Sequence, residues 1–409
     1  MKMSNLSWCT VSLTAVAVTS VLLAYLLGGS HHPTARDPDI DLTTVELLAK
    51  YGYPAESHTV VTEDGYILTL HRIPYGKKSP EKANRPPVLI QHGIISSSVE
   101  WLIMGPEKSL GYILADAGYD VWFGNCRGNY FSSKHVTLNP SSAEYWNFSW
   151  HEMGIYDLPI ITDYILKRTG QEKLSYIGHS MGASMFFVMA SEMPEYNKKF
   201  NFMIALTPAV YIEYCRSPLP KIFAIAGNQL EWLLNLFGIY QILPRTGLIT
   251  FVGRHICSDG AVTQPICINI LDLNVAYNQK ETNASALPLI LSHAPAGASI
   301  KTFQHFGQNI NSGEFRKYDY GEEKNLLVYS SRTPPQYDMS KITVPVAIMY
   351  GQNDIVVDPR DVVKTKEVLP NVVAYLKVKD EEFTHIDFAW AINAKSLVYE
   401  DILKLLRKY

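Results

Sequence analysis

The chain has 409 residues, of which 47% are hydrophobic and 18% are charged, and its formal net charge is -3. This length suits one large α/β domain that carries an insertion, and the apolar content is sufficient for a sizeable core. The small net charge argues against a nucleic-acid-binding protein, and without H-E-x-x-H or paired C-x-x-C sequences no metal or cofactor is expected.

The first 30 residues have the layout of a secretory signal. Lys2 precedes an apolar run over residues 11–27, and small residues follow at 28–30. This order of basic, apolar and small residues is typical of a signal peptide that is removed by cleavage. The apolar run is also close to the length of a spanning helix, so an uncleaved membrane anchor is the alternative. Either form directs the rest of the chain into the secretory pathway.

Strand-like and helix-like segments alternate between residues 31 and 207. Two strand-like segments flank Asp64-Gly65 and predict a hairpin over residues 58–73. Further strands are expected over residues 88–90, 120–123, 173–177 and 202–206, and helices over residues 157–168 and 183–193. Strands that alternate with helices at this spacing indicate an α/β fold with a mostly parallel, doubly wound sheet.

The alternation stops at Pro208 and resumes at residue 344. Residues 208–343 are apolar and helix-like, with many prolines and no clear strand. In residues 344–409, strands are expected over 344–350 and 372–378, and helices over 359–369 and 394–408. The simplest arrangement is one sheet built from residues 31–207 and 344–409, with residues 208–343 inserted as a helical cap. A second independent domain is the alternative, but the last strands need the first ones to complete a sheet.

Residues 178–182 read Gly-His-Ser-Met-Gly, a G-x-S-x-G sequence between an expected strand and an expected helix. In this setting the sequence is typical of a nucleophile elbow, where a serine lies on a sharp strand-to-helix turn. Its two glycines allow the backbones to approach without a Cβ clash, and the helix N-terminus favours a developing oxyanion. The sequence therefore predicts Ser180 as the nucleophile of a serine hydrolase, with a plain tight turn as the alternative.

Two later residues are expected to complete a catalytic triad with Ser180. In α/β-hydrolases an acid follows a late strand and a histidine follows the last strand. Asp354 lies just after the expected strand 344–350, and His385 lies after the expected strand 372–378. The other acids and histidines fit this order less well; they are Asp358, which precedes a proline and is expected to cap a helix, Asp387, His179, His293 and His305.

An oxyanion hole needs two backbone N–H groups near the nucleophile. One is expected from Met181, the residue after Ser180, and the other from Ile94, which follows His92-Gly93 at the end of an early strand. A plain turn is the alternative reading of His92-Gly93.

Four cysteines lie beyond the leader, at Cys126, Cys215, Cys257 and Cys267. The near pair Cys257 and Cys267 can close a short disulfide loop in an oxidising compartment, and two unpaired buried thiols are the alternative. Asn147 and Asn283 begin two N-x-S sequences, which are acceptor sites for glycosylation and agree with secretion.

The insertion contains two strongly apolar stretches, at residues 223–226 and 230–240. Near a serine nucleophile, an apolar insertion suggests a lid that shields an acyl-chain tunnel and contacts a lipid surface. An ordinary buried helix pair is the alternative.

From about residue 39 to its end, the chain resembles the acid lipase family of gastric and lysosomal lipases and their insect relatives. The matching stretches are residues 50–54 (KYGYP), 63–72 (EDGYILTLHR), His92-Gly93, 124–128 (GNCRG), 178–182, 292–297 (SHAPAG), 350–354 (YGQND), and His385 with Asp387-Phe388. Several motifs in order over most of the chain are more specific than the elbow alone. Two departures are Met181, where mammalian members usually carry glutamine, and Ile94-Ile95-Ser96 in place of the common leucines.

The resemblance implies an α/β-hydrolase that hydrolyses neutral lipid esters, either triacylglycerols or sterol esters, in a lysosome or another acidic lumen. It assigns the triad to Ser180, Asp354 and His385, the oxyanion donors to Ile94 and Met181, and a cap to the insertion, and it supports a Cys257–Cys267 bridge. The protein is therefore expected to be a secreted or lysosomal lipase that acts at a lipid–water interface without a cofactor. Alternatives are a short-chain esterase or acyltransferase with the same triad, a non-catalytic lipid carrier, and a membrane-tethered lipase.

Overall fold

The computed structural model describes residues 38–82 and 84–409. The predicted signal segment, residues 1–30, and most of the linker that follows it lie outside the described residues. Among the described residues, no helix is long and apolar enough to cross a membrane.

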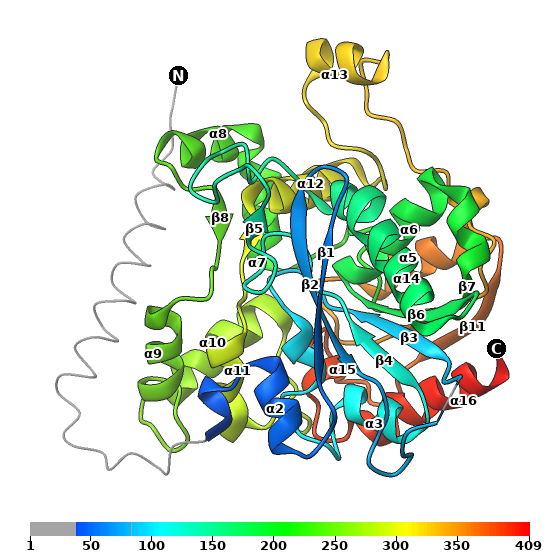
Figure 1. The fold of residues 1–409 in the computed structure, drawn as a ribbon. Coiled ribbons are helices and arrows are strands. Elements are labelled where there is room, and N and C mark those ends of the chain that lie inside the picture. Colours follow the sequence, from blue (N-terminus) through cyan, green and yellow to red (C-terminus); the bar gives the residue numbers. More distant parts are fainter. Residues whose placement is uncertain (1–37, 83) are drawn as a thin grey trace.

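A nine-stranded sheet forms the centre of the described chain (Figure 1). Its order is β1-β2-β4-β3-β6-β7-β10-β11, with β5 added beside β2. The strands are β1 (Glu56–Val61), β2 (Tyr66–Ile73), β3 (Pro87–Gln91), β4 (Asp120–Phe123), β5 (Lys134–His135), β6 (Leu174–His179), β7 (Phe200–Leu206), β10 (Val346–Tyr350) and β11 (Val372–Lys377). The strands from β4 to β11 in this order run parallel, while β1, β2 and β5 pair antiparallel. The predicted mostly parallel α/β sheet is confirmed.

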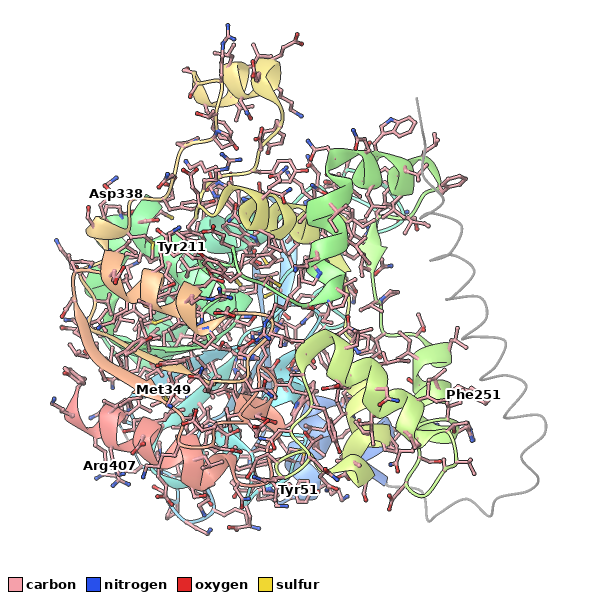
Figure 2. All side chains as sticks on the ribbon, turned by 180° about the vertical axis from the view of Figure 1, so that it is seen from behind. Tyr51, Tyr211, Phe251, Asp338, Met349 and Arg407 are labelled. Carbon is pink, nitrogen blue, oxygen red and sulfur yellow. A yellow bond between two sulfur atoms is a disulfide. The ribbon has the colours of Figure 1, made fainter. Side chains whose placement is uncertain are left out.

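Two apolar cores lie on the two faces of this sheet, because successive side chains of a strand point to opposite faces. On β7, Met203 belongs to one core, whereas Phe202 and Ile204 belong to the other. The first core is covered by α5 (Leu158–Thr169) and α6 (Met181–Glu192), and the second by α3 (Leu110–Asp116) and α16 (Glu400–Lys408). Figure 2 shows the side chains that fill the space on both sides of the sheet around Met349.

The remaining helices of the two sheet-forming segments are short or flank the sheet. They are η1 (Pro38–Asp41), α2 (Thr44–Lys50), η2 (Ser98–Trp101), α4 (Trp150–Glu152), η3 (Met153–Asp157), η4 (Pro194–Lys199), α14 (Pro359–Val368), α15 (Asp387–Trp390) and η7 (Lys395–Tyr399). Neither α2 nor α3 was expected from the sequence. In α3 the pattern is obscured by Gly111, a poor helix former that is required because a Cβ there would lie 2.7 Å from the ring of Phe123.

The segment between β7 and β10 is mainly helical. Its elements are α7 (Pro218–Ala226), α8 (Asn228–Leu236), β8 (Gln241–Ile242), α9 (Gly247–His255), α10 (Gln264–Val275), η5 (Ala284–Ala286), α11 (Leu287–His293), β9 (Ala298–Ser299), α12 (Ile300–Ser312), α13 (Glu322–Tyr329) and η6 (Met339–Lys341). The expectation of no strand here is corrected, because β8 and β9 pair antiparallel over two residues each. Strands this short leave no alternating pattern in the sequence.

Candidate active site

Ser180 lies on the sharp turn between β6 and α6. Its backbone has φ 53° and ψ -118°, a conformation that L-residues rarely adopt and that costs roughly 1–3 kcal/mol. The flanking glycines make this turn possible. A Cβ on Gly178 would lie 2.7 Å from the amide nitrogen of Ala183, and one on Gly182 would lie 2.6 Å from the carbonyl oxygen of Gln91. The turn has the geometry that a nucleophile elbow requires.

Asp354 and His385 come together beside the elbow, although 31 positions separate them. Asp354 follows β10 and His385 follows β11, so the two loops leave neighbouring parallel strands at the same edge of the sheet. Nδ1 of His385 donates to Oδ2 of Asp354 at 2.8 Å. Because Nδ1 carries its proton toward a carboxylate, Nε2 of His385 is free to act as a base.

The carboxylate of Asp354 is fully buried, and every hydrogen bond it makes is one that it accepts. Its Oδ1 accepts from the backbone amides of Val356 (2.8 Å) and Val357 (2.9 Å), and its Oδ2 also accepts from the hydroxyl of Thr207 (2.5 Å). Burial opposes ionisation, but the charge and hydrogen bond of His385, followed by the bonds from Thr207 and Val357, outweigh burial and lower the pKa of Asp354. The acid is therefore ionised over the whole physiological pH range.

The ring of His385 is not hydrogen-bonded to the Ser180 hydroxyl in the described chain. Nδ1 of His385 donates to Asp354, and the main-chain oxygen of His385 accepts from Nε2 of His179. Ser180 and His385 are nevertheless both nearly buried, and the ring of His179, the neighbour of Ser180, lies 5.0 Å from the ring of His385. Catalytic hydrogen bonds of unliganded enzymes are often long and shorten in the substrate complex. The contact between Ser180 and His385 stays a prediction.

The loop after β3 brings a second backbone amide to Ser180. A Cβ on Gly93 would lie 3.2 Å from Cβ of Ser180, so the 93–94 peptide passes directly beside Ser180. Nε2 of His92 accepts from the amide of Cys126 at 3.2 Å, and Nδ1 of His92 therefore carries the proton and donates to the Gly93 carbonyl at 2.7 Å. A trans peptide points its N–H away from its carbonyl, so this bond orients the amide of Ile94.

The amides of Ile94 and Met181 are both available to a ligand. Met181 is the first residue of α6, where a helix leaves its amides without a partner inside the helix. Among the hydrogen bonds of residues 38–82 and 84–409, neither amide donates to another group. The arrangement suits an oxyanion, which needs two such donors beside the nucleophile.

Two of the motifs seen in the sequence lie behind this loop. Ala296, in the SHAPAG stretch, donates its amide to the carbonyl of Ile95 at 2.7 Å and accepts from the amide of Tyr130 at 3.0 Å. Asn129, which follows the GNCRG stretch, donates to the carbonyl of Ser96 and to His92. These stretches therefore support the loop that carries Ile94, a role that the sequence alone did not reveal.

Two further residues near the site were also missed. Thr207, with φ 40°, follows β7 and donates to Asp354. Glu100 is buried, and its Oε1 lies 2.7 Å from Nδ1 of His179. The sequence signal that could have identified Glu100 is its charge within the apolar stretch 99–104, because a buried carboxylate requires a partner.

The rival acids and histidines lie outside the candidate triad. Asp358 is the N-cap of α14 and accepts from the Arg360 amide, which agrees with its expected structural role. Asp387 accepts from the amide of Thr384 at 2.8 Å, and burial raises its pKa to about 6. The two histidines of the insertion bind elsewhere, His293 to the carbonyl of Asp39 and His305 to Ser149 and the carbonyl of Arg316.

The structure joins Cys257 and Cys267 in a disulfide that links the end of α9 to α10, while Cys126 and Cys215 are buried free thiols. The two predicted glycosylation acceptors lie at the surface to different degrees, with Asn147 exposed and Asn283 half-buried. Glycosylation of both stays a prediction.

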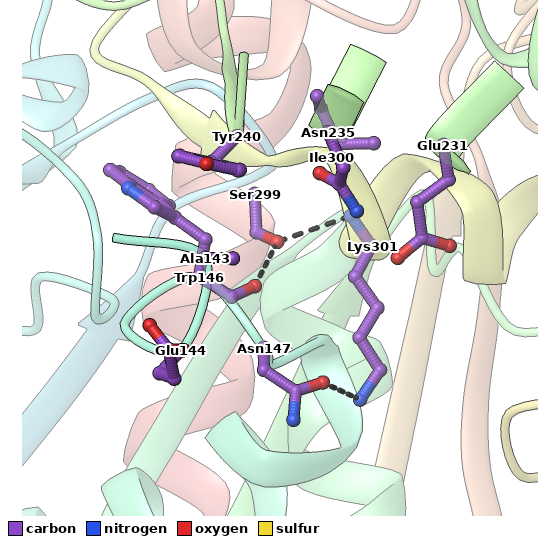
Figure 3. Close-up of a pocket in the computed structure, with 10 residues that line it drawn as sticks. All are labelled: Ala143, Glu144, Trp146, Asn147, Glu231, Asn235, Tyr240, Ser299, Ile300 and Lys301. Atoms are coloured by element: carbon purple, nitrogen blue, oxygen red, sulfur yellow. Dashed lines mark hydrogen bonds between the residues drawn. The ribbon is translucent and has the colours of Figure 1, made fainter. Parts of the chain in front are cut away.

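A pocket of about 250 Å³ is shown in Figure 3. It is lined by Ala143, Glu144, Trp146, Asn147, Glu231, Asn235, Tyr240, Ser299, Ile300 and Lys301. None of the candidate catalytic or oxyanion residues lines it. Among the described residues there is also no group of three or more His, Cys, Asp and Glu side chains that could hold a metal ion.

A doubly wound sheet with a serine elbow, an Asp–His pair and two free amides at one edge defines an α/β-hydrolase. Residues 44–105 match the family described as a partial alpha/beta-hydrolase lipase region, and residues 86–391 match the alpha/beta hydrolase fold. Three relatives are similar over most of their length. Gastric triacylglycerol lipase of Mus musculus is 40% identical (95% of this chain, 98% of the relative), and Lipase 1 of Drosophila melanogaster is 42% identical (90% and 81%). Lysosomal acid lipase/cholesteryl ester hydrolase of Homo sapiens is 36% identical (92% and 93%).

The chain therefore belongs to the family of α/β-hydrolase lipases that includes the gastric and lysosomal acid lipases. The resemblance seen in the sequence is confirmed, and the protein is a lipase.

Proposed function

We propose that this lipase hydrolyses the ester bonds of neutral lipids through an acyl-serine intermediate on Ser180. The observation that carries the proposal is the 2.8 Å hydrogen bond between Asp354 and His385 beside the strained turn at Ser180. In this position the imidazole is fixed in the tautomer that a general base requires.

The chemistry follows from these positions. His385 takes the proton of the Ser180 hydroxyl while the oxygen attacks the ester carbonyl. The amides of Ile94 and Met181 donate to the oxyanion that forms. His385 then gives the proton to the departing alcohol. In the second half of the reaction His385 takes a proton from water, whose oxygen attacks the acyl-serine carbonyl, and the proton passes to the Ser180 oxygen as the fatty acid leaves. Asp354 stays ionised throughout and stabilises the imidazolium.

The substrate class is supported by two observations. Similar proteins carry the names triacylglycerol lipase and cholesteryl ester hydrolase. In addition, α8 exposes large apolar side chains, with Trp232 and Leu236 each 65% exposed and Phe237, just after α8, 71% exposed. Contiguous apolar side chains at a protein surface mark a contact site. Residues 208–343 act as a cap whose apolar face, defined here as Trp232, Leu236 and Phe237, meets the lipid–water interface.

The protein follows the secretory pathway and works outside the cell or in the lysosome. This location is supported by the signal-like residues 1–30, by the Cys257–Cys267 disulfide and by the lysosomal relative. N-terminal sequencing of the mature protein separates a cleaved form from one that is tethered by residues 11–27.

A hydrolysis panel tests the substrate assignment. The purified protein is expected to release fatty acid from emulsified triolein or cholesteryl oleate faster than from a soluble short-chain ester, measured between pH 4 and 8. A preference for the short ester would indicate a carboxylesterase instead. Transfer of the acyl group to an added alcohol in place of water would indicate an acyltransferase, and no turnover of any ester would indicate a lipid carrier.

Removal of the apolar face of the cap is expected to affect emulsified substrates selectively. Burial of one such side chain contributes about 1.5–3 kcal/mol, so Trp232→Ser with Leu236→Ser should lower the rate on triolein emulsions by about tenfold or more. The rate on a soluble short ester should change by less than about twofold. Val363→Ser removes an exposed apolar side chain of α14 and is the matched control. Equal losses on both substrates would contradict the assignment of this face.

A further inference from the structure

A buried acid–histidine pair lies directly behind the candidate triad. Glu100 comes from the short helix η2, and His179 is the last residue of β6, immediately before Ser180. Oε1 of Glu100 lies 2.7 Å from Nδ1 of His179, and each residue is only 5% exposed. The other nitrogen of His179, Nε2, lies 2.9 Å from the main-chain oxygen of His385.

The hydrogen-bond partners of His179 determine which of its ring nitrogens carry a proton. A carbonyl oxygen only accepts hydrogen bonds, so Nε2 of His179 must carry a proton toward His385. An ionised carboxylate also only accepts, so Nδ1 carries a second proton toward Glu100. Burial opposes both charges, but the attraction between the two groups outweighs it, lowering the pKa of Glu100 and raising the pKa of His179. The pair is therefore an imidazolium and a carboxylate.

The surroundings of the pair keep water out and keep the ring in place. The ring of Trp101 lies edge-on to His179 at 6.0 Å, and the ring of Phe388 lies at 6.2 Å. The other titratable groups that interact with the pair are His92, Asp354, Cys126 and Tyr399. In a buried site of this kind, a hydrogen bond from the charged ring of His179 to a neutral carbonyl is stronger than the same bond at the protein surface.

Three segments that are far apart in sequence meet at His179. They are the η2 segment, the nucleophile elbow and the loop that carries His385, the last being 206 positions from His179. Asp354 orients the imidazole of His385 through its side chain, but a side-chain bond does not fix the main chain from which that imidazole extends. The bond from His179 to the His385 carbonyl fixes the main chain.

We propose that Glu100 and His179 form a positioning pair that fixes the main chain of the catalytic base relative to the nucleophile. His179 is not a catalytic residue, since it acts through His385 and makes no hydrogen bond with Ser180. The inference rests on the proposed role of His385 as the base. This role gives a reason for a histidine at position 179, because its two ring nitrogens can donate to a carboxylate on one side and to a carbonyl on the other.

A double-mutant cycle tests this inference. Removal of His179 alone would leave a buried carboxylate without a partner and could prevent folding, so both members are replaced in Glu100→Leu with His179→Phe. A small displacement of a catalytic group costs about 100-fold, so kcat on a soluble ester should fall by about that factor with KM nearly unchanged. In a His385→Ala background the same two replacements should lower the residual rate by less than about twofold, because the group they position is gone.

Two further variants separate positioning from general destabilisation. Glu100→Gln keeps a partner for Nδ1, since its amide can accept from the charged ring or donate to the neutral one, and should retain kcat within about threefold. His305→Phe removes another buried histidine, stacked on Trp150 far from Ser180 in the sequence, and should leave kcat within about twofold of the wild type.

Two results would overturn the positioning role. One is a wild-type kcat for the doubly replaced protein, and the other is a full 100-fold loss that persists in the His385→Ala background. Failure of the underlying assignment would look different, because a His385→Ala protein with wild-type turnover would show that His385 is not the base.

Discussion

Ser180→Ala is expected to lower kcat by about a million-fold, the loss typical of removing the nucleophile of a serine hydrolase. Alanine lacks the oxygen that attacks the ester, and no other described side chain replaces it on the turn between β6 and α6. The loss should appear for emulsified and soluble esters alike. Labelling by a fluorophosphonate probe, followed by intact mass, should disappear together with turnover, while the thermal unfolding midpoint stays near that of the wild type.

Ser184→Ala is the matched control for this experiment. Ser184 lies one turn further along α6, is fully buried, and donates to the Ala209 carbonyl at 2.7 Å. Its removal should cost about 1 kcal/mol of stability, typical of one hydrogen bond, and should leave both turnover and labelling intact. Wild-type hydrolysis by the Ser180→Ala protein would reject Ser180 as the nucleophile.

Asp354→Asn is expected to lower kcat by about 10,000-fold with little change in folding. An asparagine oxygen can still accept from the amides of Val356 and Val357, so its NH₂ group must face His385. That group donates to Nδ1 and moves the ring proton to Nε2, where the base must be free. The hydroxyl of Thr207 can turn and accept, so the local structure should survive.

The neighbouring acid Asp358 provides the control for this replacement. Asp358→Asn keeps a side-chain acceptor at the N-cap of α14, and kcat should stay within about twofold of the wild type. Similar losses from both replacements would mean that the loop, and not the Asp354–His385 bond, is what matters.

The lowered pKa of Asp354 has a consequence for the pH dependence of activity. A carboxylate whose pKa is lowered in the folded state contributes stability above its unfolded pKa and loses it only as the pH falls through the folded value. The acid limb of a kcat/KM profile is therefore expected to report protonation of a group other than Asp354. Calorimetric unfolding of wild type and Asp354→Asn between pH 3 and 7 should show that the stability difference shrinks toward the acid end.

Much of this protein could be predicted from local sequence signals. The alternation of apolar segments predicted the parallel sheet, and the observed limits of β4 match the expected residues 120–123. The elbow could be recognised because its G-x-S-x-G sequence lies between an expected strand and an expected helix. Asp354 and His385 could be found from chain order alone, since each follows a strand whose place in the sheet determines where its loop emerges. These features depend on neighbours in sequence or on topology.

What only the tertiary structure decided is which distant groups become partners. Thr207 bonds a carboxylate 147 positions away, and Glu100 bonds a histidine 79 positions away. Which ring nitrogen of His92 carries the proton depends on the amide of Cys126, 34 positions further along the chain. The identity of a side chain does not determine which distant donor or acceptor it will contact after folding. Once the side chain is buried, that partner is essential because water cannot replace it. The proposed nucleophile, acid and base could therefore be predicted from the sequence, whereas the groups that orient them were identified only from the tertiary structure.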